Sequence, residues 1–167
     1  LLPLNELDKE TREMWLGRIV KVKKSSDNAR IHKVAGAGEL IKGKLRMHNG
    51  LVIDPLSYYG APVMRMLMEN KAVHEPQEEY VFQEVLKYMP ENATMLEVGC
   101  YWGFYSMWFA SKIKGARNFL TDNSDGIARA KANFAMNKLQ ARFMTGYIGR
   151  DQPNSPVPLT NVDRICK

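Results

Sequence analysis

The chain has 167 residues, of which 45% are hydrophobic and 25% charged, and its formal net charge is +6. This length and composition are typical of a soluble globular protein with one core, and no apolar stretch approaches the roughly 18 residues that cross a membrane, so we expect no membrane partner. The basic residues are scattered along the chain. We therefore interpret them as a solvated positive surface and do not expect a nucleic-acid partner.

Cysteine usage and the first residues of the chain bear on its compartment. Cys100 and Cys166 lie far apart, with neither metal-ligand spacing nor a disulfide framework, which fits a reducing environment. The start of the chain has no signal-peptide pattern. We therefore expect a cytoplasmic protein without a metal site. Because the chain begins with Leu1 and not with Met, we expect its natural start to lie upstream.

The first part of the chain is predicted to contain helices and a hairpin. Apolar residues share one helical face between Asn5 and Arg18, with Asn5 as the expected N-cap. Alternating apolar residues within Lys44–Asp54 flank an Asn-Gly pair, which favours a hairpin with a type I′ turn. The methionine-rich segment Pro62–Asn70 is expected to be a short helix whose methionines fill the core.

The next helix is expected to begin at Pro76, because proline suits the first helical position and glutamates follow it. Val81, Val85 and Met89 recur at helical spacing and predict its buried face. Strands then alternate with helices: strand 95–98, helix 104–113, strand 117–121, helix 125–137 and strand 141–145. This order predicts right-handed crossovers and a parallel sheet. We expect a Rossmann-like α/β domain over residues 74–167, preceded by an α+β extension over residues 1–73.

The residues that suggest chemistry lie in or just after the first two strands of this pattern. Gly99 and Gly103 come after the first strand, Glu97 lies within it, and Asp122 lies nineteen positions after Gly103. A strand, a glycine turn, a helix and a later acid at this distance are typical of a nucleotide-binding corner. Taken singly, the glutamate is as well explained as a satisfied buried carboxylate, the aspartate as a helix cap, and the glycines as turn residues. Their joint order and spacing favour the nucleotide site.

The glycine spacing bears on the kind of nucleotide. An NAD site uses Gly-x-Gly-x-x-Gly, whose middle glycine lets the pyrophosphate approach. Here the bulky Tyr101 and Trp102 fill the interval between Gly99 and Gly103, and a pyrophosphate would be crowded. A Gly-Lys-Ser/Thr phosphate loop is also absent from the sequence. The pattern therefore favours S-adenosylmethionine, which has no phosphate, over NAD.

The stretch Met95–Ser106, followed by Asp122 and by Ala130–Asn137, resembles the FkbM-type branch of the class I S-adenosylmethionine-dependent methyltransferases. The segment Val157–Asp163 is similar to the part of that family ahead of its fourth strand, so the resemblance covers about residues 74–167. It implies that one group of residues lines the methionine end of the cofactor and that another binds the ribose. The first group is Glu97, Gly99, Cys100, Tyr101 and Gly103, and the second is Asp122 and Asn123.

The chain also departs from the family pattern. Tyr101 stands where the family often has a small residue or Asn, and the second acid lies in Thr-Asp-Asn-Ser where the family has a Glu-Pro pair. Class I methyltransferases build a seven-stranded sheet, and this chain stops near the expected fourth strand. We therefore expect a fragment of a longer domain, with most contacts to the methyl acceptor beyond Lys167.

The resemblance implies direct methyl displacement onto an oxygen of a small molecule or sugar. His74 is a candidate general base because it precedes the helix that leads to the first strand, with Glu75 or Glu78 as second choices. A histidine at a helix start is more often a cap or a surface residue. Cys100 would have a lowered pKa if it faced a helix N-terminus, but pocket lining is its better interpretation.

Two further interpretations stay open at this point. The chain is alternatively a non-catalytic Rossmann-like module, a truncated or inactive relative that binds a nucleotide or a protein partner; an NAD enzyme is a more distant third. Residues 1–73 are expected to form a lid or a dimer contact, so a homo-oligomer is one expected assembly.

Overall fold

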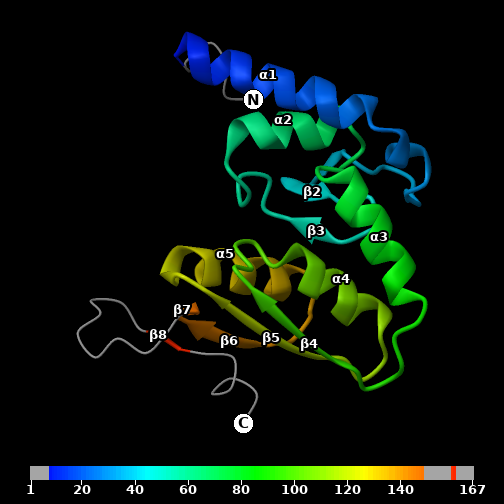
Figure 1. Cartoon of the computed structure of the whole chain (residues 1–167), viewed down its shortest axis with the longest axis vertical. Helices are drawn as coiled ribbons and strands as arrows, with labels where there is room; N and C mark the ends of the chain where they lie inside the picture. The colour runs from blue at the N-terminus through cyan, green and yellow to red at the C-terminus, as the bar shows by residue number, and fades with distance from the viewer. Residues whose placement is uncertain (1–7, 149–158, 161–167) are drawn as a thin grey trace. The chain divides into compact units, whose positions relative to one another are not determined.

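The computed structural model describes residues 8–148 and 159–160 of the chain. The chain divides into two compact units, Leu1–Met89 and Pro90–Lys167. The expected division lay after residue 73, so the helix that begins at Pro76 belongs with the first unit and not with the second. The described residues form a mixed α/β structure with five α-helices and a parallel three-stranded sheet (Figure 1).

The first unit begins with α1 (Lys9–Lys24), which is longer than the expected helix. Its N-cap is Asp8, whose carboxylate accepts a hydrogen bond from the Thr11 N–H at 2.9 Å. Asn5, the expected cap, lies outside the described residues. The helix is followed by the short 3₁₀ helix η2 (Ser26–Ala29).

The helix α2 (Ala61–Glu69) confirms the predicted methionine-rich helix, and α1 lies beside it (Figure 1). Met64 and Met66 are buried in the core of the unit, as expected of flexible apolar side chains that fill gaps. Lys23 of α1 joins Glu69 of α2 through an ion pair of 3.1 Å.

A small antiparallel sheet confirms the predicted hairpin but not its turn. The strands β2 (Lys44–Arg46) and β3 (Val52–Ile53) pair with each other, and β1 (Leu40–Ile41) pairs with β2. A type I′ turn requires positive φ at both central residues. Between β2 and β3 only Gly50 has positive φ, whereas Lys42 and Gly43 between β1 and β2 both have it. The type I′ signature therefore belongs to the earlier connection, and Asn49-Gly50 lies within a longer loop, residues 47–51.

The helix α3 (Pro76–Leu86) begins at proline as predicted, but its expected buried face was wrong. Val81, Val85 and Met89 are all exposed, and Glu79 is completely buried. Glu79 and Val81 lie on nearly opposite sides of a helix with 3.6 residues per turn. The buried side of α3 is therefore set by a carboxylate that has partners in the interior, and the apolar residues at helical spacing face outward.

The second unit follows the predicted alternation closely. Its elements are β4 (Thr94–Val98), α4 (Phe104–Lys112), β5 (Arg117–Asp122), α5 (Ser124–Met136) and β6 (Arg142–Thr145). The three strands are parallel in the order β4-β5-β6, and both helices lie on the same face of this sheet (Figure 1). A further parallel pair joins β7 (Tyr147–Ile148) to β8 (Leu159–Thr160). The rest of the resembling segment 157–163, like Cys166, lies outside the described residues.

Aromatic and aliphatic side chains form the core between the helices and the sheet of this unit. Phe104 and Met107 of α4, Leu120 of β5 and Phe134 of α5 are each less than 2% exposed. Burial of side chains of this size contributes about 1.5–3 kcal/mol each, which fixes both helices against the sheet. The packing also determines where the loop between β4 and α4 can lie.

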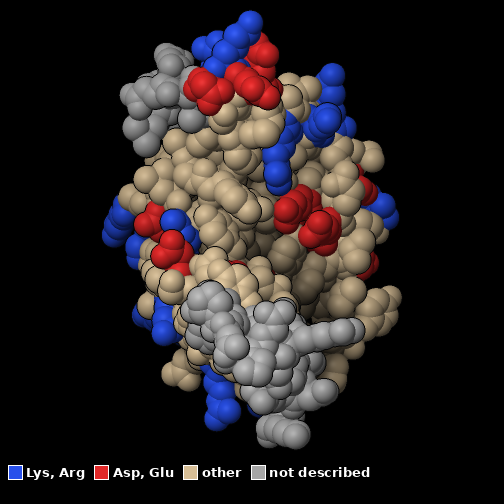
Figure 2. Space-filling model, turned by 60° about the vertical axis from the view of Figure 1, so that its left-hand side comes forward, with Lys and Arg blue, Asp and Glu red and all other residues tan. Residues whose placement is uncertain are grey.

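Charged side chains of both signs are spread over the face drawn in Figure 2, with Lys and Arg among Asp and Glu. Among the described residues, no helix is both long enough and apolar enough to span a bilayer.

Candidate functional site

The candidate site is the corner where β4 and β5 end side by side. Val98 and Thr121 are paired in the parallel register. Immediately after β4, the N–H groups of Gly99 and Cys100 both donate to the carbonyl of Thr121, at 2.9 and 3.2 Å. These bonds hold the start of the loop between β4 and α4 against the end of β5, next to Asp122.

The loop contains three residues with positive φ: Gly99 at +72°, Tyr101 at +45° and Gly103 at +73°. A Cβ at Gly99 would meet no atom within 4 Å, so glycine there serves the backbone turn. A Cβ at Gly103 would lie 3.1–3.2 Å from Ala130, Leu120 and Phe134. Gly103 therefore permits the close packing of α4 and the loop onto the core, a role separate from the cofactor lining that the resemblance implies for it.

Asp122 ties this loop to the end of β5. Its Oδ2 accepts a hydrogen bond from the Tyr101 N–H at 2.7 Å, and its Oδ1 accepts one from the Asn123 N–H at 2.6 Å. Both bonds come from backbone donors, so they fix the carboxylate orientation without neutralising its charge. An ionised carboxylate offers about four acceptor positions, and two of them are used by these donors.

Asn123 is the residue that caps α5. Its side-chain oxygen accepts a hydrogen bond from the Gly126 N–H at 2.9 Å. The helix cap that the sequence allowed for Asp122 is thus the next residue, Asn123. Because the side-chain oxygen of Asn123 makes the capping bond, the ribose contact expected of this residue would use another of its atoms.

Gly126 is a residue of the corner that the sequence reasoning missed. A Cβ at this position would lie 2.5 Å from Cγ and 2.7 Å from Oδ1 of Asp122. Real Cβ atoms do not approach other atoms so closely, so this glycine makes room for the carboxylate. Its signal in the sequence is a glycine in a first helical turn, where glycine is otherwise unfavourable.

Glu97 lies at the penultimate position of β4, where it is half-buried. Its Oε2 accepts a hydrogen bond from the Ser106 N–H, in the first turn of α4, at 3.0 Å. Burial raises the pKa of Glu97 to about 7, with a smaller contribution from the charge of Asp122, while the bonds from Ser106 oppose the rise. Among the described residues, no lysine or arginine forms an ion pair with this carboxyl group. Near neutral pH it can therefore exchange its proton.

The remaining residues of the loop differ in burial. Cys100 is buried, and burial together with the charges of Glu97 and Asp122 raises the pKa of its thiol, contrary to the lowered pKa considered for a helix N-terminus. Trp102 is also buried and stacks on Phe104, with ring centroids 5.1 Å apart. Tyr101 is half-buried, which leaves it as the aromatic residue of the loop best placed to face a ligand.

Two contacts from α5 hold the loop in this arrangement, and neither was anticipated. The Asn133 side chain donates to the Trp102 carbonyl at 3.0 Å, and Asn133 is itself completely buried. The guanidinium of Arg129 lies 5.5 Å from the centre of the Tyr101 ring. The loop is thus fixed from β5, through Asp122, and from α5.

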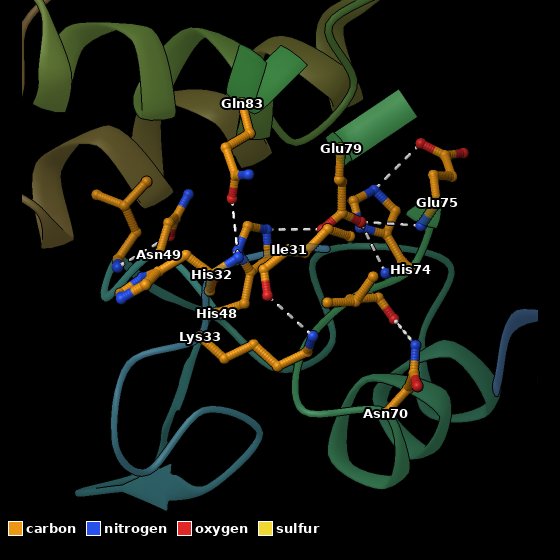
Figure 3. Close-up of polar contacts among 12 residues, drawn as sticks. Ile31, His32, Lys33, His48, Asn49, Asn70, His74, Glu75, Glu79 and Gln83 are labelled. Atoms are coloured by element: carbon orange, nitrogen blue, oxygen red, sulfur yellow. Dashed lines mark hydrogen bonds and ion pairs between the residues drawn. The ribbon is translucent and has the colours of Figure 1, made fainter. Parts of the chain in front are cut away.

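His74, the candidate general base, lies in the first unit within a buried cluster of His48, His74 and Glu79 (Figure 3). The two oxygens of Glu79 are each 2.6 Å from a histidine nitrogen, Nε2 of His48 and Nδ1 of His74. The other ring nitrogen of His74 is 3.2 Å from Glu75. Because both nitrogens of His74 face carboxylates and the side chain is only 1% exposed, this geometry supports a structural role.

The charges of this cluster are balanced internally. Burial opposes ionisation of Glu79, but the charge and hydrogen bonds of His74 and His48 outweigh it and lower the pKa of Glu79. Burial likewise disfavours a charged His74, but the Glu79 and Glu75 carboxylates outweigh it and raise the pKa of His74. Among the residues that the structure describes, no three His, Cys, Asp or Glu side chains are arranged as metal ligands.

Comparison of the sequence with models of known protein families finds no match, and comparison with curated proteins finds none either. The function proposed below therefore rests on the corner itself: seven of the eight candidate residues, from Glu97 to Asn123, lie around the ends of β4 and β5, and His74 lies in the other unit.

Proposed function

We infer that the second unit is the cofactor-binding part of an S-adenosylmethionine-dependent methyltransferase resembling the FkbM-type branch. The observation that carries this proposal is the corner at the ends of two parallel strands. There Asp122 and Glu97 flank a loop whose glycines serve the turn and the helix packing, while Tyr101 occupies its middle.

The loop fits a nucleotide without a pyrophosphate. Three glycines in a dinucleotide site serve a tight turn, close approach of the pyrophosphate, and close packing of helix on strand. Gly99 performs the first of these tasks and Gly103 the third. No glycine is available for the second, because that part of the loop holds Tyr101 with its N–H already bonded to Asp122. This distribution favours S-adenosylmethionine over NAD.

The carboxylate of Asp122 fits a ribose. After the bonds from Tyr101 and Asn123 it keeps about two acceptor positions, and these suit the two hydroxyl donors of a ribose. Its orientation is fixed in advance by those backbone donors. The entropy lost on binding a sugar is correspondingly smaller than for a mobile side chain.

Glu97 fits the cationic end of the same ligand. The carboxyl group has a pKa of about 7, so a positively charged group nearby would draw it into the ionised form at neutral pH. The amino acid part of S-adenosylmethionine carries an ammonium group beside the sulfonium. When bound, this cofactor supplies an electrophilic methyl group.

The residues of the chain then act by binding and orienting. Asp122 would hold the ribose and Glu97 the charged end, and the fixed loop would set the distance between them. A methyl acceptor needs its nucleophile in line with the methyl group, so a rigid corner favours transfer by positioning. We propose a hydroxyl group of a small molecule or sugar as the acceptor class.

Isothermal titration of the full chain with S-adenosylhomocysteine tests this function. We expect saturable binding, and in Asp122→Asn an affinity weaker by about 10- to 100-fold, because charged hydrogen bonds contribute about 1.5–3 kcal/mol. The matched control is Asp125→Asn, an exposed acid in the first turn of α5, which should bind like the unaltered protein. No binding of S-adenosylhomocysteine by the folded chain would overturn the proposal.

A second measurement separates the enzyme from a non-catalytic relative. S-adenosylmethionine carrying a labelled methyl group is incubated with the chain and a mixture of sugars and hydroxylated small molecules. Transfer of the label supports the methyltransferase. Saturable binding without transfer to any acceptor would instead favour a module that binds the nucleotide without chemistry.

A further inference from the structure

The first unit has an open groove between its helices α1 and α2. The groove has a volume of about 300 Å³, and Leu16, Ile19 and Val20 of α1 line it. Ile19 is buried, whereas Leu16 and Val20 are both exposed. The groove therefore presents apolar side chains to the solvent.

Cations lie at one end of this groove. Lys23 and Arg65 line it, and both pair with Glu69, at 3.1 and 2.7 Å. Lys24 also lines it and is exposed, and among the described residues it forms no ion pair with a carboxylate. Residues four positions apart are neighbours on a helix surface, so Lys24 follows Val20 along the same side of α1.

The helix α3 has an exposed apolar face made of Val81, Val85 and Tyr88, which are between 42% and 81% exposed. Tyr88 lies just after the helix, in a turn where its N–H donates to the Val85 carbonyl at 3.0 Å. The spacing i, i+4 and i+7 puts the three side chains on one side of the helix. Single exposed apolar residues are common on protein surfaces, but three in this spacing are typical of a helix that binds in a groove.

An acid stands at the start of this apolar face. Glu78 is exposed, and in the part of the chain that the structure describes it forms no ion pair. It precedes Val81 by three positions and so lies near the same side of α3. Along α3 an acid therefore comes before the apolar residues, whereas along α1 a cation comes after them.

We propose that the groove between α1 and α2 binds the apolar face of α3 from a second copy of this chain, with α1 and α3 antiparallel. Glu78 of the second copy then lies opposite Lys24, and Val81 lies opposite Val20. An exposed charge pair contributes little stability, so this pair mainly sets the direction of binding, while the apolar contacts supply the attraction. Because the groove and the apolar face are different surfaces, the contact is heterologous and each copy can bind two others.

Sedimentation velocity of the full chain over a range of concentrations measures this association. We expect species larger than the monomer whose size grows with concentration, because a heterologous contact continues from copy to copy unless it closes into a ring. A chain that stays monomeric up to about 1 mM would overturn the proposal.

Two variants at exposed positions identify the surfaces. Val20→Glu blocks the groove and Val85→Glu blocks the apolar face, and each should weaken association by at least about 10-fold with an unchanged melting temperature. An equimolar mixture of the two should form a dimer and nothing larger, because one variant keeps the apolar face and the other keeps the groove. Self-association of either variant alone would overturn the proposal in favour of a symmetric contact between like surfaces.

A control and a charge exchange complete the test. Met14→Glu changes an exposed apolar residue of α1 that does not line the groove, and it should associate like the unaltered protein. Lys24→Glu and Glu78→Lys should each weaken association by about 5-fold, because each places like charges opposite one another. The variant with both changes should regain the original affinity, and a failure to regain it would contradict the antiparallel contact.

Discussion

Each unit of the protein has a glutamate whose pKa is strongly shifted, and the two pKa values are shifted in opposite directions. Glu79 in the first unit lies 2.6 Å from each of two buried histidines, which lower its pKa. Glu97 in the second unit accepts a hydrogen bond from a backbone N–H, has no ion-pair partner among the described residues, and its pKa is raised to about 7.

The difference shows how the surroundings of a carboxylate separate a structural role from a binding role. The charge of Glu79 is compensated within the fold by the two buried histidines. Removing this carboxylate would leave the buried histidines without their compensating negative charge. Glu97 has a charge that the fold leaves uncompensated. A cationic ligand supplies what the fold does not, so this carboxyl group is the better candidate for binding.

The largest expected effect comes from breaking the compensated site. Glu79→Gln leaves His48 and His74 buried without their carboxylate, and we expect the first unit to lose about 3–5 kcal/mol of stability. Hydrogen exchange of the α3 and β2 amides measures this loss separately from the second unit. The control is Glu78→Gln, an exposed neighbour in the same helical turn, which should change stability by less than about 0.5 kcal/mol. A similar loss in both variants would show that Glu79 is not compensated as described.

A smaller effect separates the two glycines of the corner. Gly103→Ala places a Cβ against Ala130, Leu120 and Phe134 in a left-handed conformation, and we expect a loss of about 2–4 kcal/mol from strain and overpacking. Gly99→Ala meets no neighbouring atom and should lose only the conformational cost of about 1–2 kcal/mol. Urea unfolding of the two variants makes the comparison. If Gly99→Ala were the more damaging, the division of roles between the glycines would be reversed.

The smallest effect concerns pH and distinguishes the two glutamates. The folded state raises the pKa of Glu97 from 4.5 to about 7, so its protonated form contributes stability that is fully present below pH 4.5 and is lost as the pH rises through 7. Between pH 5 and 8 the free energy of unfolding of the second unit should therefore fall by on the order of 1–3 kcal/mol more in the unaltered protein than in Glu97→Gln. Urea unfolding at both pH values measures this difference, and identical pH profiles would contradict the raised pKa.

The first unit should respond to alkali in a different range. Its carboxylates raise the pKa of His74, so the stability from the charged form is fully present below the ordinary pKa of 6.5 and is lost only as the pH rises above it. As the pH rises from 5, the second unit should therefore lose stability before the first unit does.

The strands and helices from β4 to β6 were predictable because apolar runs, glycines and helical spacing agree there. Each predicted element from 95 to 145 ends within one or two residues of the observed one. The corner was also predictable, since parallel strands bring their carboxyl ends together and Glu97 and Asp122 follow from that geometry.

The first unit was less predictable because its organisation depends on polar contacts between distant residues. Apolar spacing suggested that Val81 and Val85 face the core, but the pairing of Glu79 with His48, thirty-one positions away, sets the buried side of α3 instead. The separate roles of Gly99 and Gly103 were likewise hidden, because a sequence does not show which atoms would surround a Cβ.

The closeness of Gly126 to Asp122 has a consequence for how the sequence of this protein can change. A Cβ at position 126 and the carboxylate in its present orientation would occupy the same space, with 2.5 Å between Cβ and Cγ. Substitutions at positions 122 and 126 are therefore coupled. A lineage that gains a side chain at 126 must first give up the acid at 122 or turn it away from the loop, and either change would uncouple Tyr101 from the end of β5.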